Sequence, residues 1–221
     1  MQRVGTSRFV GTIPEIVRND ESLYEGDLKH YFRILFNHAR NLNGPYHNFR
    51  HMFHVMWLCY DACRFYADRL TKREMRDLLI AALFHDFDHI GRTGNDDLNI
   101  ALALRGLKKY IAPEDQLFLA DIVELVRPTE YPYKITAETL SLSQKILRDA
   151  DISQAFSVAW IQQVVFGLAA EMSSTPRALL GMQEAFIRGT VFNTEWAEKK
   201  FAKEKDSKIE EARGLIALLE E

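Results

Sequence analysis

The chain has 221 residues, of which 47% are hydrophobic, and this is enough to bury one sizeable core within the usual length of a single domain. Its formal net charge at pH 7 is only −3, from 28 Lys and Arg residues against 31 Asp and Glu residues. This balance disfavours a dedicated nucleic-acid binder, because such proteins neutralise a phosphate backbone with an excess of basic side chains. We therefore predict one domain over residues 1–221, with no nucleic-acid polymer as a partner.

The N-terminal segment lacks the apolar run of a signal peptide, and no window approaches the run of about 18 apolar residues that a membrane span needs. We therefore expect a soluble, cytoplasmic protein with no membrane partner. The two cysteines, Cys59 and Cys63, are four residues apart in an apolar helical pattern. This arrangement fits buried thiols better than a disulfide framework or a zinc knuckle.

The first half of the chain shows apolar residues at helical spacing. Pro14 could open a short helix, and Thr71 with Glu74 forms a capping-box pattern at the start of a strongly apolar segment. A glycine-punctuated loop follows at Ile90–Asp97. In chain order, the helices expected after Pro14 cover residues 27–42, 48 to about 69, 73–87 and 98–110.

The second half continues in the same way. We expect a helix over 113–127, one that Thr136 caps and that extends to 156, one that Pro176 starts, and a charged amphipathic helix over 194–221. Alternating strand patterns, internal repeats and low-complexity linkers are absent from the sequence. The sequence therefore predicts an all-α fold, a compact helical bundle whose last helix could pack on its own core or on a second subunit, as in a homodimer.

Five of the seven histidines lie in two short apolar segments. The first, "YHNFRHMFH", contains His47, His51 and His54, which share one stripe because residues three or four apart lie on the same face of a helix. Unpartnered polar groups are costly at an apolar wall, so these imidazoles need a partner.

The second segment, "LFHDFDHIG", supplies two more histidines and two carboxylates at the end of an apolar helix: His85, Asp86, Asp88 and His89. Neutral imidazole nitrogens combined with carboxylate oxygens suit zinc, manganese, iron or magnesium. A further carboxylate follows at Asp151, after another apolar helix. A lone histidine on an apolar face is usually a core residue, but this concentration favours a metal site.

These motifs carry a resemblance to a known family. The order His, His-Asp, Asp resembles the HD-domain metal-dependent phosphohydrolases, and two longer strings look like signatures of their 3',5'-cyclic nucleotide phosphodiesterase branch: "YHNFRH" at Tyr46–His51 and "HDFDHIG" at His85–Gly91. The segment "ADIS" at Ala150–Ser153 follows in the family's order. Gln183 and Phe186 have the Gln-x-x-Phe spacing with which that family holds a nucleotide base.

The resemblance implies a role for each matching residue. A first divalent ion, zinc, manganese or iron, would be held by His51, His85, Asp86 and Asp151, and Asp86 would bridge to a second ion, magnesium or manganese. His47 would donate a proton to the leaving oxygen, and His89 would lie beside the bridging water or the phosphate. The substrate-binding residues would be Tyr46, Gln183 and Phe186, with Asn48 in their supporting shell.

The sequence also departs from the family pattern. The loop from His89 to Asn95 is one residue longer than usual, and His54 stands where the family usually has Asp. The segment Leu98–Ala101 replaces a Glu-Asn-His-His string, which is expected to remove polar groups near the second metal ion.

The predicted activity is hydrolysis of a 3',5'-cyclic nucleotide to the 5'-monophosphate by metal-bound hydroxide. A divalent ion lowers the pKa of bound water from 15.7 to about 7, and a histidine such as His47 can act as a general acid near neutral pH. Two alternatives use the same metal ligands: an HD-type 5'-nucleotidase or guanosine polyphosphate hydrolase, and a sensory module that binds metal or nucleotide but has lost turnover.

Overall fold

The computed structural model describes residues 20–91, 94 and 96–220, and no strand occurs among them. This confirms the predicted all-α fold. The helix expected at Pro14 and the loop residue Asn95 lie outside the described residues.

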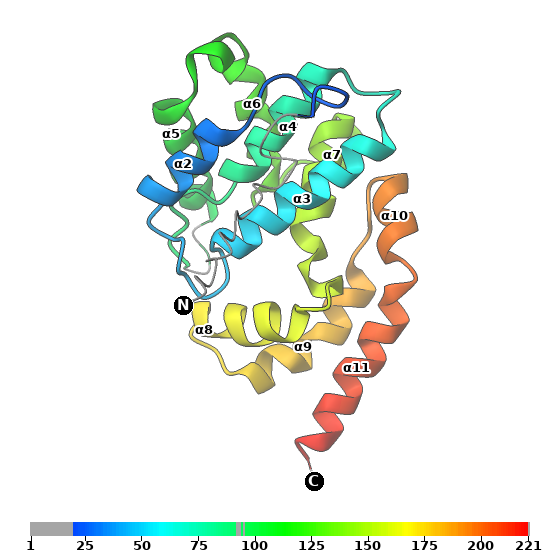
Figure 1. Cartoon of the computed structure of the whole chain (residues 1–221). Helices are drawn as coiled ribbons and strands as arrows, with labels where there is room; N and C mark the ends of the chain where they lie inside the picture. The colour runs from blue at the N-terminus through cyan, green and yellow to red at the C-terminus, as the bar shows by residue number, and fades with distance from the viewer. Residues whose placement is uncertain (1–19, 92–93, 95, 221) are drawn as a thin grey trace, which may run out of the picture.

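A bundle around one central helix forms the larger part of the structure (Figure 1). Helix α4 is central because every residue from Met75 to Phe84 is buried, and it packs against α3, α6, α7 and α5. Most of these side chains belong to one hydrophobic core. The helices of this bundle are α2 (Lys29–His38), α3 (Phe49–Phe65), α4 (Lys72–Phe84), α5 (Asp96–Tyr110), α6 (Leu119–Val126), α7 (Leu142–Ile152) and α10 (Glu195–Phe201).

A second group of helices lies across one end of this bundle, at the bottom of Figure 1. It comprises the π-helix η5 (Ile161–Leu168), α8 (Ala169–Glu171), α9 (Pro176–Gly189) and α11 (Glu204–Leu218). Two small apolar clusters join these elements, one around Tyr46, Val164 and Leu179 and one around Trp160 and Leu180. Short 3-10 turns make up most of the remaining connections: η1 (Pro113–Phe118), η2 (Arg127–Thr129), η3 (Ala137–Thr139) and η4 (Ser153–Phe156).

The helix starts follow side-chain capping in most cases. The capping box of Thr71 and Glu74 is present, and Thr175 caps the helix that Pro176 begins. The predicted start at Thr136 is wrong: residues after it form only the short turn η3, and its side chain makes no capping bond. Ser141 caps α7 instead, because it forms a complete capping box with Gln144.

Two other expectations about helices are corrected. The helix expected over 194–221 is divided at residues 202–203, because α10 packs on α3 and α7 whereas α11 packs on α9. The helix expected from Pro113 begins as the 3-10 turn η1 and becomes α-helical only at Leu119. The helical segment η5–α8 was not expected at all.

A buried ion cluster ties the start of the bundle to its centre. Asp115 has no exposed surface and accepts hydrogen bonds from Arg73 Nη1 at 2.7 Å and from Arg76 Nε and Nη2 at 2.8 and 2.7 Å. The Tyr31 hydroxyl on α2 donates to the same carboxylate at 2.5 Å. Burial opposes the ionised form, but these donors outweigh it and hold the pKa of Asp115 below its ordinary value.

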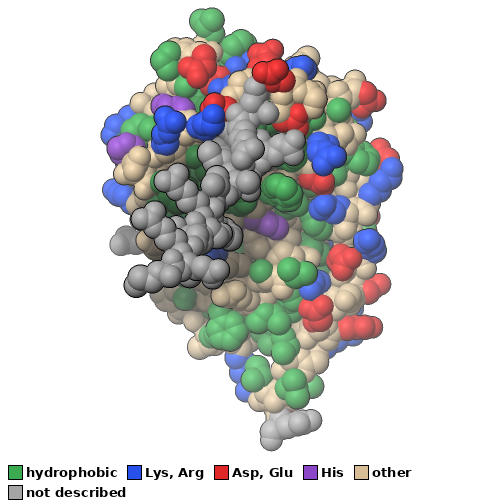
Figure 2. Space-filling view, viewed as in Figure 1, with side chains coloured by type: hydrophobic (Ala, Val, Ile, Leu, Met, Phe, Trp, Pro, Cys, Tyr) green, Lys and Arg blue, Asp and Glu red, His purple; other side chains and the backbone are tan. Residues whose placement is uncertain are grey.

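The surface carries both signs of charge. Figure 2 shows acidic and basic side chains interspersed over the α2–α7 bundle, and hydrophobic side chains gathered at the end that α8 and α9 occupy. Cys59 and Cys63 are free and buried, as predicted. Within the described residues, no single helix has the length and apolar composition to cross a membrane, although the pair Leu142–Phe156 and Ile161–Glu171, bent by 93°, meets both criteria together.

Candidate metal centre and adjoining cavity

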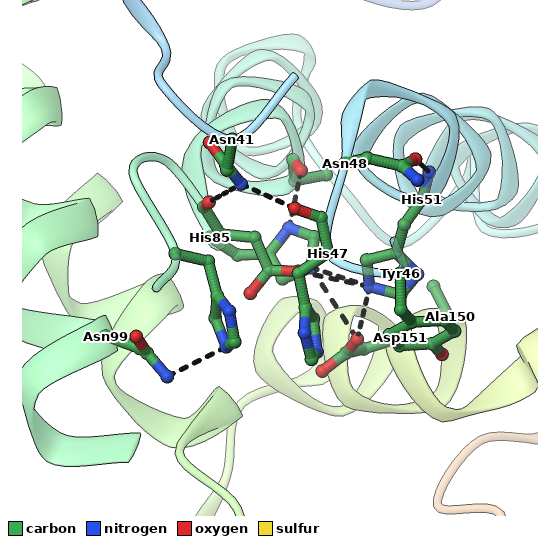
Figure 3. A network of polar contacts seen from close by, with 12 residues as sticks. Asn41, Tyr46, His47, Asn48, His51, His85, Asn99, Ala150 and Asp151 are labelled. Atoms are coloured by element: carbon green, nitrogen blue, oxygen red, sulfur yellow. Dashed lines mark hydrogen bonds and ion pairs between the residues drawn. The ribbon is translucent and has the colours of Figure 1, made fainter. Parts of the chain in front are cut away.

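Three helix ends bring the two histidine motifs and Asp151 together (Figure 3). Asn48 starts α3 by accepting hydrogen bonds from the backbone N–H of Arg50 at 2.8 Å and of His51 at 3.2 Å. His51 therefore lies in the first turn of α3, while His85 lies at the C-terminal end of α4 and Asp151 in the last turn of α7. The capping role of Asn48 explains why the polar side chain stands at this place in the motif.

Two imidazole nitrogens, His51 Nε2 and His85 Nε2, lie between two carboxylate oxygens, Asp86 Oδ2 and Asp151 Oδ1. The five separations that involve a histidine nitrogen run from 3.1 to 3.6 Å. Ligands about 2.0–2.2 Å from a tetrahedral metal ion lie about 3.3–3.6 Å from one another. His51, His85 and Asp151, whose ligand atoms all lie within 4.8 Å of one another, therefore have the size and donor chemistry that fit a divalent ion, and Asp86 lies 3.2 Å from both imidazoles.

A hydrogen bond behind His85 directs its free nitrogen toward the other donors. The Nδ1 atom of His85 donates to the backbone carbonyl of Ala82 at 2.7 Å, which leaves Nε2 for the cluster. One oxygen of Asp86, Oδ2, is buried with no hydrogen-bond partner although both imidazoles lie 3.2 Å away. An orphaned carboxylate oxygen among imidazole nitrogens is the arrangement that a bound cation would satisfy.

The charges of the four groups depend on one another. Burial alone would lower the pKa of His51, but its close contacts with the carboxylates of Asp151 and Asp86 outweigh burial and raise the pKa to about 9. The same two carboxylates raise the pKa of His85 well above its ordinary value despite burial. The imidazoles in turn hold the pKa of both carboxyl groups below the ordinary range. A pair of fixed negative charges thus attracts two positive charges to this point.

A second group contains His47, His89 and Glu171. Glu171 Oε2 accepts the backbone N–H of Tyr46 at 3.1 Å and of His47 at 3.0 Å, while its Oε1 bonds His47 Nδ1. The two imidazole rings stack with centroids 3.7 Å apart, and His89 Nδ1 lies 3.9 Å from Glu171 Oε1. Burial opposes ionisation of Glu171, but its bond to His47 outweighs burial and keeps the pKa below its ordinary value. The carboxylate is therefore ionised at neutral pH and faces an imidazole.

Two close backbone approaches bring Glu171 to this position. A Cβ atom at Gly167 in η5 would lie 2.6 Å from the carbonyl oxygen of Pro45, so only glycine lets the π-helix lie against the segment before His47. Gly91, with φ of +67°, lies so close to Glu171 that a Cβ would be 2.7 Å from its Cγ. The last residue of "HDFDHIG" therefore makes room for a carboxylate from α8.

Two asparagines support the histidines. Asn41 Nδ2 donates to the carbonyl oxygens of His47 at 2.7 Å and Asp86 at 2.8 Å, and so ties the two motifs together (Figure 3). The Nδ2 atom of Asn99 is 2.8 Å from Nε2 of His89, and the Oδ1 atom of Asn99 accepts a hydrogen bond from the backbone N–H of Ile90 at 3.1 Å. Asn99 is thus the one polar side chain of the segment Leu98–Ala101, and it is buried and bonded.

A cavity of about 780 Å³ adjoins both groups. Six of the expected site residues line it: Tyr46, His47, His89, Asp151, Gln183 and Phe186. Gln183 is buried, donates from Nε2 to the carbonyl of Leu179 at 3.2 Å, and has no partner for Oε1. Asn48 does not line the cavity, because its amide is used to cap α3 and to bond the carbonyl of Gly44.

Two residues of the motifs lie apart from these groups. His54 lines a different, smaller cavity, and burial lowers its pKa to about 4. Asp88 turns outward, where it accepts the backbone N–H and the guanidinium of Arg40, both at 2.9 Å.

Sequence reasoning did not identify Glu171 or Asn41. Glu171 follows a segment that was not predicted to be helical and is 124 residues from its partner His47. Asn41 lies at the end of the predicted 27–42 helix and had no feature beyond its closeness to the first motif. Only tertiary packing shows the role of either residue.

A comparison with models of known protein families matches the region that contains both histidine motifs. Residues 46–107 match the family model described as 3'5'-cyclic nucleotide phosphodiesterase. A search of curated proteins gave no match to the chain. The matched segment contains His47, His51, His85, Asp86 and His89. The resemblance to the 3',5'-cyclic nucleotide phosphodiesterases is thereby confirmed over the segment that carries both histidine motifs.

Proposed function

We propose that this chain is a metal-dependent phosphohydrolase that converts a 3',5'-cyclic nucleotide to its 5'-monophosphate. The observation that carries the proposal is the group of His51, His85 and Asp151, whose ligand atoms all lie within 4.8 Å of one another. Asp86 lies 3.2 Å from both imidazoles, and Asp151 also lines the large cavity. The family match over residues 46–107 supports the same class of reaction.

The four residues of this cluster would hold the first ion, which we expect to be zinc, manganese or iron. Asp86 would also serve a second ion, magnesium or manganese. Bound ions of this kind supply an activated water and neutralise charge on the phosphate. The chain's own contribution is to fix the donors: the bond from His85 Nδ1 to Ala82 orients that imidazole, and the cap at Asn48 fixes the backbone of His51 in the first turn of α3.

His47 is the proposed proton donor to the leaving group. Its ring lines the cavity, and its Nδ1 is bonded to Glu171, so its Nε2 is the nitrogen free to protonate the departing ribose oxygen. Glu171 would fix the direction of the ring, as a buried carboxylate does for a catalytic histidine. His89 stacks on this ring and would lie beside the phosphate.

The apolar part of the cavity would hold the base. Phe186 is half-buried there and offers a ring face, while Tyr46 packs edge-on against His47. Because Nε2 of Gln183 is engaged with Leu179, its free Oε1 can accept a hydrogen bond from a base N–H. A small nucleotide is therefore the proposed substrate.

Turnover by metal-stripped protein reconstituted with zinc, manganese or magnesium tests the proposal. The substrate panel contains cyclic mononucleotides, 5'-monophosphates and guanosine polyphosphates. We expect metal-dependent release of 5'-monophosphate from the cyclic substrates, and loss of both bound metal and activity in Asp151→Asn. Asp88→Asn is the matched control, because Asp88 belongs to the same motif region but faces Arg40.

The other outcomes separate the alternatives. Cleavage of monoesters or polyphosphates alone would place the chain among other HD-type hydrolases, and bound metal with no turnover on any substrate would favour a sensory module. A cytoplasmic location and a homodimer stay predictions of the sequence.

A further inference from the structure

A second, smaller cavity of about 410 Å³ lies outside the proposed active site, between the start of α3 and the chain from η4 to η5. Its lining residues are Arg50, His54, Gln154, Ala159, Gln162 and Gln163. None of them lines the larger cavity, and no carboxylate is among them.

The lining combines one cation with unsatisfied neutral polar groups. Arg50 is on the exposed side of α3, and its guanidinium makes no hydrogen bond or ion pair with any residue that the structure describes. Two atoms of the lining are buried without a partner, Nε2 of His54 and Oε1 of Gln163. A buried polar group without a hydrogen-bond partner is destabilising, so a ligand that pairs with these atoms would be bound favourably.

The backbone on one side of this cavity has an unusual form. Gln162 and Gln163 lie in the eight-residue π-helix η5, and Gln163 is only 7% exposed. π-Helical segments are rare and occur frequently at functional sites. The opposite wall is α3, on which Arg50 and His54 are four residues apart and share a face.

The geometry points to a binding site for a phosphate group in this cavity. The guanidinium of Arg50 would pair with the negative oxygens, which it suits by charge and planarity. Oε1 of Gln163 accepts hydrogen bonds only, so its partner must carry a donor. A phosphate monoester has a second pKa of about 6 and so retains a P–OH donor near that pH, whereas sulfate carries none. The phosphate could come from inorganic phosphate or from a nucleoside monophosphate.

Titration of the full chain at pH 6 with inorganic phosphate, adenosine 5'-monophosphate or sulfate tests this site, followed by the side-chain amide signals in ¹H–¹⁵N NMR spectra. Single Gln→Met variants assign the signals of Gln154, Gln162 and Gln163. We expect millimolar phosphate to change the chemical shifts of these signals. The Arg50→Gln variant should bind phosphate at least tenfold more weakly in the same titration. Arg64→Gln, an exposed arginine of the same helix outside the cavity, should leave phosphate binding unchanged.

The two phosphate sources and the proposed active site are separated by the same experiment. Tighter binding of the monophosphate than of inorganic phosphate identifies the nucleotide as the ligand, and equal or weaker binding identifies the free ion. Movement of the Gln183 signal alone, equal affinity for sulfate, or no movement at tens of millimolar phosphate would each overturn the assignment. None of these results depends on whether the chain hydrolyses cyclic nucleotides.

Discussion

Glu171 binds His47 at two points, since one carboxylate oxygen accepts the backbone N–H of His47 at 3.0 Å while the other bonds its ring at Nδ1. The residue that we propose as the proton donor is therefore fixed in both position and ring orientation by a single side chain from α8. This contact joins the first histidine motif to the group of helices at the other end of the cavity.

Replacement of this carboxylate should reduce turnover without removing the metal. In Glu171→Gln, the amide oxygen can still accept the two backbone N–H groups, but the carboxylate oxygen that bonds the His47 ring is lost. We expect kcat for cyclic nucleotide hydrolysis to fall about 10- to 100-fold, with metal content unchanged by elemental analysis. Glu198→Gln, an exposed residue of α10, is the control. Unchanged kcat in Glu171→Gln would remove Glu171 from the mechanism.

A methyl group at Gly167 should separate the π-helix from the segment before His47. The new Cβ would lie 2.6 Å from the carbonyl oxygen of Pro45, and backbone on both sides limits relaxation. We expect Gly167→Ala to lower the free energy of unfolding by about 1–3 kcal/mol and to reduce kcat as well, because Glu171 is displaced. Urea denaturation and steady-state kinetics measure the two effects.

The matched control for this substitution is Gly214→Ala. Gly214 lies inside α11, and no atom lies within 4 Å of the position that an added methyl group would take, so alanine should raise the free energy of unfolding by about 0.5–1 kcal/mol. If the two variants unfolded alike, the close approach at Pro45 would have no energetic significance.

Truncation of Gln183 should affect substrates that carry a base. Its free Oε1 faces no partner, so a base N–H is its proposed donor. In Gln183→Ala we expect KM for a cyclic nucleotide to rise about tenfold, which corresponds to one hydrogen bond of about 1.4 kcal/mol. The KM of bis(p-nitrophenyl) phosphate, which has no base, should not change. Equal increases for both substrates would indicate a general packing defect instead.

The buried cluster around Asp115 predicts a specific loss of stability in acid. Arg76, Tyr31 and Arg73 hold the pKa of Asp115 below its ordinary value, so its contribution is complete above the pKa of the unfolded chain, about 3.9, and is lost as pH falls through the lower folded value. At pH 7, Asp115→Asn leaves the two guanidinium groups without their shared carboxylate, and we expect a loss of about 3–5 kcal/mol.

Denaturation curves at several pH values between 7 and 2 measure this effect, and the variant should lose less stability in acid than the wild-type chain. Glu184→Gln is the control, because Glu184 also bonds two arginines, Arg188 and Arg213, but on the surface. Exposed ion pairs contribute little, so this variant should resemble the wild type at neutral pH. Parallel pH profiles for the wild type and Asp115→Asn would contradict the assignment.

The parts of the fold that the sequence predicted are those in which local pattern and burial agree. The apolar face of α3 and the capping box at Thr71 specify their helices locally, and these helices formed as expected. Thr136 and Ser141 are both suitable caps by residue type, and only the extended backbone at Leu140 shows that the helix starts at Ser141. The π-helix η5 has no sequence rule, because its hydrogen-bond pattern is set by packing.

The same distinction between local pattern and tertiary packing applies to the residues of the candidate site. His51, His85, Asp86 and Asp151 could be selected from residue type and spacing, and the structure brings their donor atoms together. His54 lies on the same stripe of α3 as His51, but it is about one turn farther along the helix and lines the smaller cavity. Glu171 could not be selected, since its role depends on the path of the chain between α7 and α9.

The two carbonyl contacts of Asn41 have a consequence for local opening. The amide of Asn41 donates to the carbonyl oxygens of both His47 and Asp86, and its Oδ1 accepts the N–H of Asp88 at 3.0 Å. The two motif segments therefore cannot separate unless hydrogen bonds of this one side chain break. Fluctuations that release one segment should release the other, so their amide protons should exchange with solvent as one cooperative unit. The proton donor and the metal ligands would then be gained and lost together.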